Sequence, residues 1–363
     1  MKIDDLDTPV LLVDKDALER NVSRMQTLVK KGKIAYRPHA KAHKSPEIAK
    51  IQLNAGACGV CCAKLGEAEV MAANGIKDIL ITTPVIGISK LSRMMQIANQ
   101  AKVSVVVDNQ KNVEEMNKVA KTFGVRPDVV IEVDVGQGRC GVAPGEQALV
   151  LAKGVMSADW LNFKGLQGYQ GNIQMTRSFS DREIATRHAA SFLNNTAKLI
   201  KKDGIPVNYL TGGGSGTSVI DAKLAGLTEL QPGGYIFMDS RYREIEWDNG
   251  KNIPFEQSLM LLTSVISMPK PGYCVLDMGL KAVSSDGGNP SPIDLPSSDF
   301  QFAGEEHSAL TFKNGGCPLK LGAKVLFSPS HCDTTVNLYD NIIAVSSKDV
   351  VEVWKIAARG RTQ

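Results

Sequence analysis

The sequence predicts an α/β fold, a (β/α)8 TIM barrel followed by a smaller β domain. Through the first two thirds of the 363 residues, short apolar runs alternate with amphipathic stretches, and eight such runs can be distinguished. Eight is the number that a (β/α)8 barrel requires. After about residue 245 the chain changes to short strand-like runs separated by turns rich in Gly, Pro and Ser, which is typical of a β domain. We therefore expect residues 10–245 to form the barrel, and residues 246–363, together with 1–9, to form the β domain.

The expected elements follow from the hydrophobic periodicity. The run 103–107 is almost continuous in Val, as burial on both faces of a parallel sheet requires. The barrel strands are expected at 34–41, 57–63, 78–83, 103–108, 128–135, 163–169, 206–211 and 229–237. Amphipathic stretches between most of them predict helices at 64–74, 87–101, 110–123 and 181–202. In the β domain we expect a surface loop at 284–298 and strands at 259–266, 272–277, 310–312, 324–328, 341–345 and 350–358, joined by 8–13 from the N-terminal end.

Composition excludes several classes of function. The net charge is only +4, with no basic run interleaved with aromatic residues, so we expect no nucleic-acid partner. No stretch of about 18 apolar residues is present and the N-terminus lacks an apolar segment, so we expect neither a membrane span nor a signal peptide. Seven cysteines without a framework spacing indicate a reducing, cytoplasmic location. The C-x-x-C at 58–61 has no second ligand pair, so we interpret it as a buried strand.

Lys41 is the first candidate catalytic residue. It ends the first expected strand and precedes Ser45-Pro46-Glu47, which has the features of a helix start. Barrels build their sites at the carboxyl ends of strands. Nearby basic residues (Arg37, His43 and Lys44) are expected to lower its pKa, and a neutral amine is the form that attacks an aldehyde. We favour a Schiff-base lysine over the alternative, a basic loop in solvent.

Two glycine-rich segments predict a phosphate site. The segment 211–217 follows a strand, and its backbone N–H groups and hydroxyls suit a phosphate dianion; a flexible turn is the alternative. It lacks the signatures of nucleotide and dinucleotide sites. With the segment 231–235 it falls after strands 7 and 8, where barrels commonly bind phosphate. The expected ligands are Thr211, Gly213, Gly214, Ser215, Gly216, Thr217, Gly233, Gly234 and Tyr235. A lysine and a phosphate cradle in one barrel together imply pyridoxal 5′-phosphate (PLP) as cofactor.

Three further side chains are expected at the barrel mouth. Arg139 follows the fifth strand between glycines, where its fixed charge would hold the cofactor's phenolic oxygen or a substrate carboxylate. Gln167 and Tyr169 alternate on one face of the sixth strand. We predict cofactor contacts for all three and a catalytic role for Arg139 and Tyr169. A surface arginine and a packing tyrosine remain the alternatives.

His331 and Asp333 are the candidate metal ligands. In an extended segment their side chains point to the same side, and an imidazole with a carboxylate suits a divalent ion. The carboxylate favours Mn²⁺, Mg²⁺ or Co²⁺ over Zn²⁺, and two protein ligands would leave positions open for catalysis. The alternative is an Asx turn with an exposed His. The role of His307 stays open.

These segments together resemble the fold-type III PLP enzymes related to alanine racemase, within the branch of D-threonine aldolase and D-serine dehydratase. The resemblance rests on 8–14, 37–44, 134–142, 165–169, 212–217, 231–235 and 331–333, and it extends over nearly the whole chain. It implies a homodimer with shared active sites, Lys41 as the Schiff-base residue and a small amino-acid substrate. His-x-Asp at 331–333 is typical of the aldolases, whereas the dehydratases carry His-x-Cys.

One departure concerns the general base. The aldolases carry a His shortly after the Tyr-x-Gly step, and this chain has Met175 there, which cannot move a proton. A metal-bound alkoxide could form without that base. From the resemblance and the His-x-Asp pair we predict metal-assisted retro-aldol cleavage of β-hydroxy-D-amino acids to glycine and an aldehyde. The alternatives are β-elimination of D-serine or 3-hydroxy-D-aspartate, racemisation of an amino acid, and a PLP-binding regulatory protein. The side chain accepted at Cβ and the native metal stay open.

Overall fold

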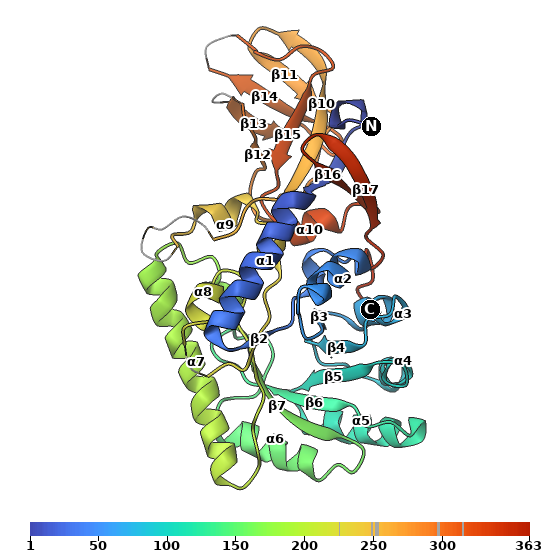
Figure 1. Cartoon of the computed structure of the whole chain (residues 1–363), viewed down its shortest axis with the longest axis vertical. Coiled ribbons are helices and arrows are strands. Elements are labelled where there is room, and N and C mark those ends of the chain that lie inside the picture. Colours follow the sequence, from blue (N-terminus) through green and yellow to red (C-terminus); the bar gives the residue numbers. More distant parts are fainter. Residues whose placement is uncertain (225, 248–249, 251–253, 296–297, 314–315) are drawn as a thin grey trace.

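A computed structural model describes residues 1–224, 226–247, 250, 254–295, 298–313 and 316–363. Figure 1 shows two bodies stacked along the long axis, with a barrel below and a β domain above. The barrel is built on an eight-stranded parallel sheet, and the β domain on a nine-stranded, mostly antiparallel sheet. The predicted fold class is therefore confirmed.

The parallel sheet has the strand order β2-β9-β8-β7-β6-β5-β4-β3. The Tyr36 carbonyl accepts from Cys58 N at 3.0 Å, and the Pro38 carbonyl accepts from Cys61 N at 2.9 Å. These bonds join the first and last strands of the order, which closes the barrel. The strands are β2 (Ala35–Tyr36), β3 (Val60–Cys62), β4 (Asp78–Ile81), β5 (Lys102–Val107), β6 (Asp128–Glu132), β7 (Asn162–Gly168), β8 (Leu210–Gly212) and β9 (Glu229–Leu230).

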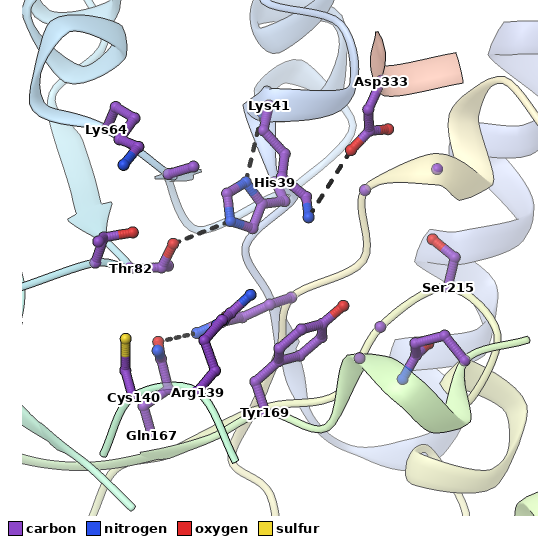
Figure 2. Close-up of a pocket in the computed structure, with 18 of the residues that line it drawn as sticks. His39, Lys41, Lys64, Thr82, Arg139, Cys140, Gln167, Tyr169, Ser215 and Asp333 are labelled. Atoms are coloured by element: carbon purple, nitrogen blue, oxygen red, sulfur yellow. Dashed lines mark hydrogen bonds and ion pairs between the residues drawn. The ribbon is translucent and has the colours of Figure 1, made fainter. Parts of the chain in front are cut away.

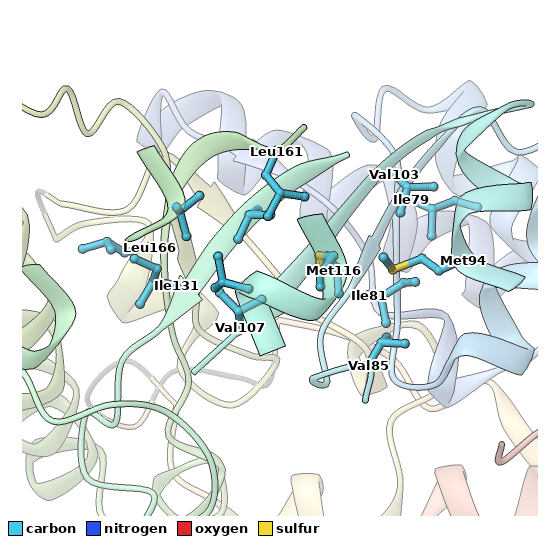
Figure 3. Close-up of a cluster of buried hydrophobic side chains, with 14 of the residues drawn as sticks. Ile79, Ile81, Val85, Met94, Val103, Val107, Met116, Ile131, Leu161 and Leu166 are labelled. Atoms are coloured by element: carbon cyan, nitrogen blue, oxygen red, sulfur yellow. The ribbon is translucent and has the colours of Figure 1, made fainter. Parts of the chain in front are cut away.

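The barrel strands are buried on both faces, as their apolar runs predict. Ile79 and Ile81 of β4 pack outward against the surrounding helices in the cluster of Figure 3. Leu80, between them, faces the barrel interior with Val106 and Val130 of the neighbouring strands. Successive side chains of a strand point to opposite faces, so one strand contributes to two cores.

The helices around the barrel follow local signals. α5 begins after Asn109, whose side chain accepts from Lys111 N, and it ends at Gly124 in the left-handed conformation (φ 67°), a common helix stop. The larger helices are α1 (Lys15–Gly32), α2 (Pro46–Asn54), α3 (Leu65–Ala73), α4 (Ile88–Ala98), α5 (Gln110–Phe123), α6 (Glu146–Met156) and α7 (Phe179–Lys202). Two short ones follow, α8 (Ser218–Asp221) and α9 (Ser240–Glu244). The four predicted helices are confirmed.

The second sheet has the strand order β13-β14-β11-β10-β1-β16-β17, with β12 and β15 attached through β10. Its strands are β1 (Val10–Asp14), β10 (Leu259–Lys270), β11 (Tyr273–Leu276), β12 (Ser291–Pro292), β13 (Ser298–Phe302), β14 (Ser308–Phe312), β15 (Lys324–Ser328), β16 (Asn341–Ser346) and β17 (Asp349–Lys355). β1 pairs with β10 and β16, as predicted for the N-terminal strand. Residues 10–14 thus belong to this sheet, although the expected barrel range began at residue 10.

Three features of the elements differ from expectation. Several strands are shorter than predicted: the first ends at Tyr36, and Lys41 lies instead in η2 (Ala40–Ala42), a single 3-10 turn. The region after residue 245 contains a regular helix, α10 (Cys332–Val336). The expected surface loop at 284–298 includes β12, which pairs with β15; residues 296–297 lie outside the described part of the chain.

Candidate active site

A cavity of about 530 Å³ lies where the barrel mouth meets α10 of the β domain. Its walls come from the carboxyl ends of β2, β3, β4, β6, β7, β8 and β9 and from the start of α10 (Figure 2). Ten of the predicted site residues line it: Lys41, Arg139, Gln167, Tyr169, Gly214, Ser215, Gly233, Gly234, His331 and Asp333. Residues far apart in the sequence therefore meet in one cavity, as the barrel rule predicts.

Lys41 is held at the base of this cavity by its own turn. Its backbone N–H donates to His39 Nδ1 at 3.4 Å, and His39 Nε2 lies 3.0 Å from Thr82 Oγ1. Burial and the Lys41 cation hold the pKa of His39 well below its ordinary 6.5, so the ring is neutral. The Lys41 side chain then extends to place Nζ 3.8 Å from Asp333 Oδ2 of the β domain (Figure 2).

The expected lowering of the Lys41 pKa is wrong. Burial does lower it, but the Asp333 carboxylate and Tyr169 oppose burial, and the pKa is raised above 10.5. The nearby basic residues do not crowd it. Arg37 turns to Glu229 and Asp78 at 3.1 and 2.7 Å, and Lys44 pairs with Glu67 at 2.6 Å. Lys41 in the cofactor-free chain is therefore a cation paired with Asp333.

Only part of the glycine-rich cradle faces the cavity. Thr211, Gly213, Gly216, Thr217 and Tyr235 are not among the residues that line the cavity, and their assignment as phosphate ligands stays a prediction. The Thr211 hydroxyl donates to Glu229 at 3.0 Å, and the Thr217 hydroxyl donates to Asp221 at 2.6 Å. These hydroxyls stabilise the loop on the side that faces away from the cavity. Gly214, Ser215, Gly233 and Gly234 remain as the cavity-facing part.

Gln174 fixes the shape of that loop. Its Oε1 accepts from Gly216 N at 3.0 Å and from Thr217 N at 3.3 Å. A Cβ atom at position 216 would lie 2.0 Å from the Gln174 carbonyl oxygen, so only glycine fits there. Ser215 Oγ in turn accepts from Tyr235 N at 2.8 Å, which ties the two glycine segments together.

The opposite wall carries a network of polar side chains whose mutual contacts the sequence does not predict. Gln231 Nε2 donates to Gln167 Oε1 and to Thr211 Oγ1, both at 2.9 Å. Arg139 lies over the Tyr169 ring, with its Cζ atom 5.7 Å from the ring centroid. Glu132 also lines the cavity. Its Oε2 atom is buried without a hydrogen-bond partner among the described residues.

The Glu132 carboxyl has an unusual acidity. Burial raises its pKa to about 7; Arg139 and a hydrogen bond from Gln167 lower it, whereas Asp108 and Asp134 raise it further. An ordinary glutamate would be fully ionised at neutral pH. The cavity floor therefore carries a carboxyl that is half protonated near neutrality.

The candidate metal ligands lie on a helix start and not in an extended segment. His331 is the N-cap residue of α10 and Asp333 is its second residue. Both side chains still reach the cavity, because the cap residue keeps an extended backbone before the turn begins. Across the described ranges, no cluster of three or more His, Cys, Asp or Glu side chains could hold a metal.

Several cavity residues lacked a recognisable sequence signal. Lys64, Thr82 and Tyr242 line the cavity. Lys64 and Thr82 follow β3 and β4, and Tyr242 lies within α9. Met175 lines it as well, so the position where the aldolases carry a His does face the site. His307 lies outside the cavity and is exposed beside the Lys281–Glu306 ion pair.

Two other expectations concern the chain as a whole. All seven cysteines are free thiols. Among the helices of the described ranges, none combines the length and the apolar character that crossing a membrane requires.

Comparison with known families gives two matches in sequence order. The model for "Alanine racemase, N-terminal domain" matches residues 13–241, and the model for "Putative serine dehydratase domain" matches residues 258–345. The first match covers the barrel and the second covers most of the β domain.

Individual relatives are similar along almost the whole chain. A D-threonine aldolase from an Arthrobacter species is 41% identical over 98% of this chain and 93% of its own. A 3-hydroxy-D-aspartate aldolase from Paracoccus denitrificans (strain Pd 1222) is 36% identical over the same shares. The crystal structure of D-threonine aldolase from Filomicrobium marinum superposes with a TM-score of 0.96 at 36% identity, covering 98% of this chain and 97% of that one.

Proposed function

The chain belongs to the family of the alanine racemase N-terminal domain, a fold-type III PLP family, and from this premise we propose that it is a PLP- and divalent-metal-dependent aldolase. Its substrates are β-hydroxy-D-amino acids, which it cleaves to glycine and an aldehyde. The similarity to two kinds of aldolase over nearly the full length supports this reaction. The dehydratase and racemase alternatives become outcomes of the experiment below.

One observation carries the proposal. The primary amine of Lys41 and the carboxylate of Asp333 lie 3.8 Å apart in one cavity, although 291 residues separate them in the chain. The amine suits a cofactor aldehyde, and the carboxylate with His331 suits a metal. A β-hydroxy-amino acid needs both groups within a few ångströms, because its amine and its hydroxyl sit on adjacent carbons.

The cavity fits PLP. Lys41 Nζ is available for a covalent bond to the aldehyde, and the cradle of Gly214, Ser215, Gly233 and Gly234 has room for a phosphate because three of the four residues lack a side chain. The bound cofactor supplies an electron sink for the bond that breaks at Cα. Arg139 offers a fixed positive charge to a carboxylate or to the phenolic oxygen. The Arg139 guanidinium lies over the Tyr169 ring, so the two side chains share one wall of the cavity.

The same cavity fits one divalent ion. Asp333 Oδ2 lies 3.8 Å from the Lys41 ammonium, so this carboxylate faces a positive group inside the cavity. His331 and Asp333 would be the protein ligands, and an imidazole with a carboxylate favours Mn²⁺, Mg²⁺ or Co²⁺. The bound ion supplies Lewis acidity to the substrate hydroxyl. The thioether of Met175 cannot accept the hydroxyl proton, so that proton must be transferred to another group or to water.

Two further parts of the proposal concern assembly and location. The cavity walls desolvate the Lys41 amine, yet the side chain as a whole keeps 40% of its surface exposed in a single chain. That remaining exposure supports a homodimer in which a partner subunit covers the cavity mouth. Seven free thiols support a reducing, cytoplasmic location. Light scattering after gel filtration tests the first part, with twice the 39.1 kDa chain mass expected.

The decisive experiment is a product screen. The PLP-loaded enzyme is incubated with D-threonine, D-serine and D-threo-3-hydroxyaspartate, with Mn²⁺ or with EDTA, and glycine, pyruvate and oxaloacetate are quantified. We expect glycine with Mn²⁺ and none with EDTA, and none from the variants H331A and K41A. Pyruvate or oxaloacetate without glycine would establish the dehydratase. Interconversion of D- and L-isomers that resists EDTA would establish the racemase.

A further inference from the structure

Asp286 lies outside the cavity but contacts one of its walls. It belongs to the segment between β11 and β12, and its Oδ2 atom is 2.6 Å from His331 Nδ1. A distance this short is typical of a hydrogen bond to an ionised group. The segment was expected to be only a surface loop, yet it reaches across the domain to the candidate metal ligand.

The Asp286 carboxylate is itself held in place. Its Oδ1 atom accepts from Ser284 Oγ at 2.7 Å and from Thr334 Oγ1 at 2.8 Å. The loop is also tied to the segment before α10, because Ser330 Oγ donates to the Gly288 carbonyl at 2.8 Å. Both carboxylate oxygens are therefore occupied by donors from fixed elements.

This arrangement decides which nitrogen of His331 carries the proton. A carboxylate only accepts hydrogen bonds, so Nδ1 must be the protonated nitrogen. The lone pair of the neutral imidazole then lies on Nε2, and the His331 side chain lines the cavity. The tautomer of a histidine is set by the hydrogen bond that its other nitrogen makes, and a carboxylate also increases the basicity of the free nitrogen.

We propose that Asp286 is a positioning residue of the metal site, which holds His331 as the Nδ1–H tautomer with Nε2 presented to the ion. The proposal rests on the proposed function, since it needs His331 to be a ligand. Partners of this kind contribute roughly 10–100-fold to metal affinity in other proteins. Asp286 is not among the residues that line the cavity, so its effect would reach the reaction through His331.

The test measures metal binding without catalysis. Wild type, D286A, D286N and H331A are stripped of metal with EDTA while keeping PLP, and Mn²⁺ is titrated by the EPR signal of the free ion. We expect D286A to weaken binding roughly 10–100-fold and D286N to weaken it less, because the amide oxygen still accepts from Nδ1. D340A is the matched control, since Asp340 is an exposed carboxylate of the same domain that accepts from Arg359 at 2.7 Å.

A second readout separates positioning from general damage. In ¹⁵N-histidine-labelled, metal-free protein, we expect His331 to be protonated on Nδ1 in the wild type and D286N, and to shift toward Nε2–H in D286A. An unchanged tautomer, or an Mn²⁺ affinity of D286A within twofold of wild type, would overturn the inference. Absence of Mn²⁺ binding in the wild type, or binding that survives in H331A, would overturn the proposed metal site instead.

Discussion

The carboxyl of Glu132 makes the stability of the barrel depend on pH near neutrality, and the substitution Glu132→Gln should remove that dependence. The side chain is 4% exposed at the end of β6. In the unfolded chain it has an ordinary pKa of 4.5, and burial raises its pKa to about 7 in the folded chain. Between these two pKa values, the folded chain keeps a proton on Glu132 that the unfolded chain releases. The folded state loses stability as the pH rises from 4.5, and the loss is complete above about 7.

The magnitude follows from the difference between the two pKa values. At 1.36 kcal/mol per pKa unit, a rise from 4.5 to about 7 amounts to about 3 kcal/mol. For a domain of this size that corresponds to a midpoint shift on the order of 5–10 °C. A glutamine does not ionise, so its contribution to stability does not change with pH. Its amide does leave a buried donor without a partner, but that cost is the same at every pH. The change with pH is therefore the quantity to measure.

Thermal unfolding by circular dichroism, on protein freed of PLP, compares Glu132→Gln with the wild type from pH 5 to pH 8.5. We expect the midpoint of the variant to rise relative to the wild type across this range and to level off above pH 7.5. Glu146→Gln, at the exposed start of α6, should follow the wild type throughout. If the two midpoints differ by the same amount at pH 5 and pH 8.5, the reasoning about Glu132 is refuted.

Three further predictions concern the cavity. K41A should show no pyridoxyl adduct on peptide mapping after borohydride reduction, whereas an adduct at any other lysine of the wild type would displace Lys41 from its role. Q174A leaves the buried N–H groups of residues 216 and 217 unsatisfied, at about 1–3 kcal/mol each, so PLP should bind at least roughly tenfold more weakly in equilibrium dialysis. Lys64 lines the cavity and has no ion pair among the described residues, so its ammonium could contact the side-chain carboxylate of 3-hydroxy-D-aspartate. K64M should therefore lower kcat/KM for 3-hydroxy-D-aspartate about tenfold relative to D-threonine. Equal losses for both substrates would exclude that contact.

The sequence predicts those parts of the site that depend on strand order. Lys41 and Arg139 follow two different strands, Gln167 lies near the end of a third, and the carboxyl ends of parallel strands meet at one edge. Their convergence therefore needs no knowledge of side-chain contacts. The same rule brings the glycine segments after β8 and β9 to the cavity.

The parts that the sequence does not predict depend on contacts across the fold. The pKa of Lys41 was expected to fall because Arg37 and Lys44 are close along the chain, but both turn to buried carboxylates. The residue that raises it, Asp333, is distant in sequence and adjacent in space. The role of Asp286 could not be predicted either, because no sequence feature of this Ser- and Gly-rich loop indicates that Asp286 contacts His331.

The helix α10 shows why the backbone around His331 and Asp333 was wrongly predicted to be extended. A five-residue segment is too short to be stable as an isolated helix, so its propensity carries little information. Its start is fixed from the barrel side, since Asp239 Oδ2 accepts from Cys332 N at 3.2 Å and Ser240 N donates to the Pro329 carbonyl at 3.1 Å. These bonds place His331 and Asp333 over Lys41. The distance between the candidate metal ligands and Lys41 is thus set by the junction of the two domains. A substitution at Asp239 should therefore change metal binding and PLP binding together, while the barrel half and the β-domain half of the cavity each keep their structure.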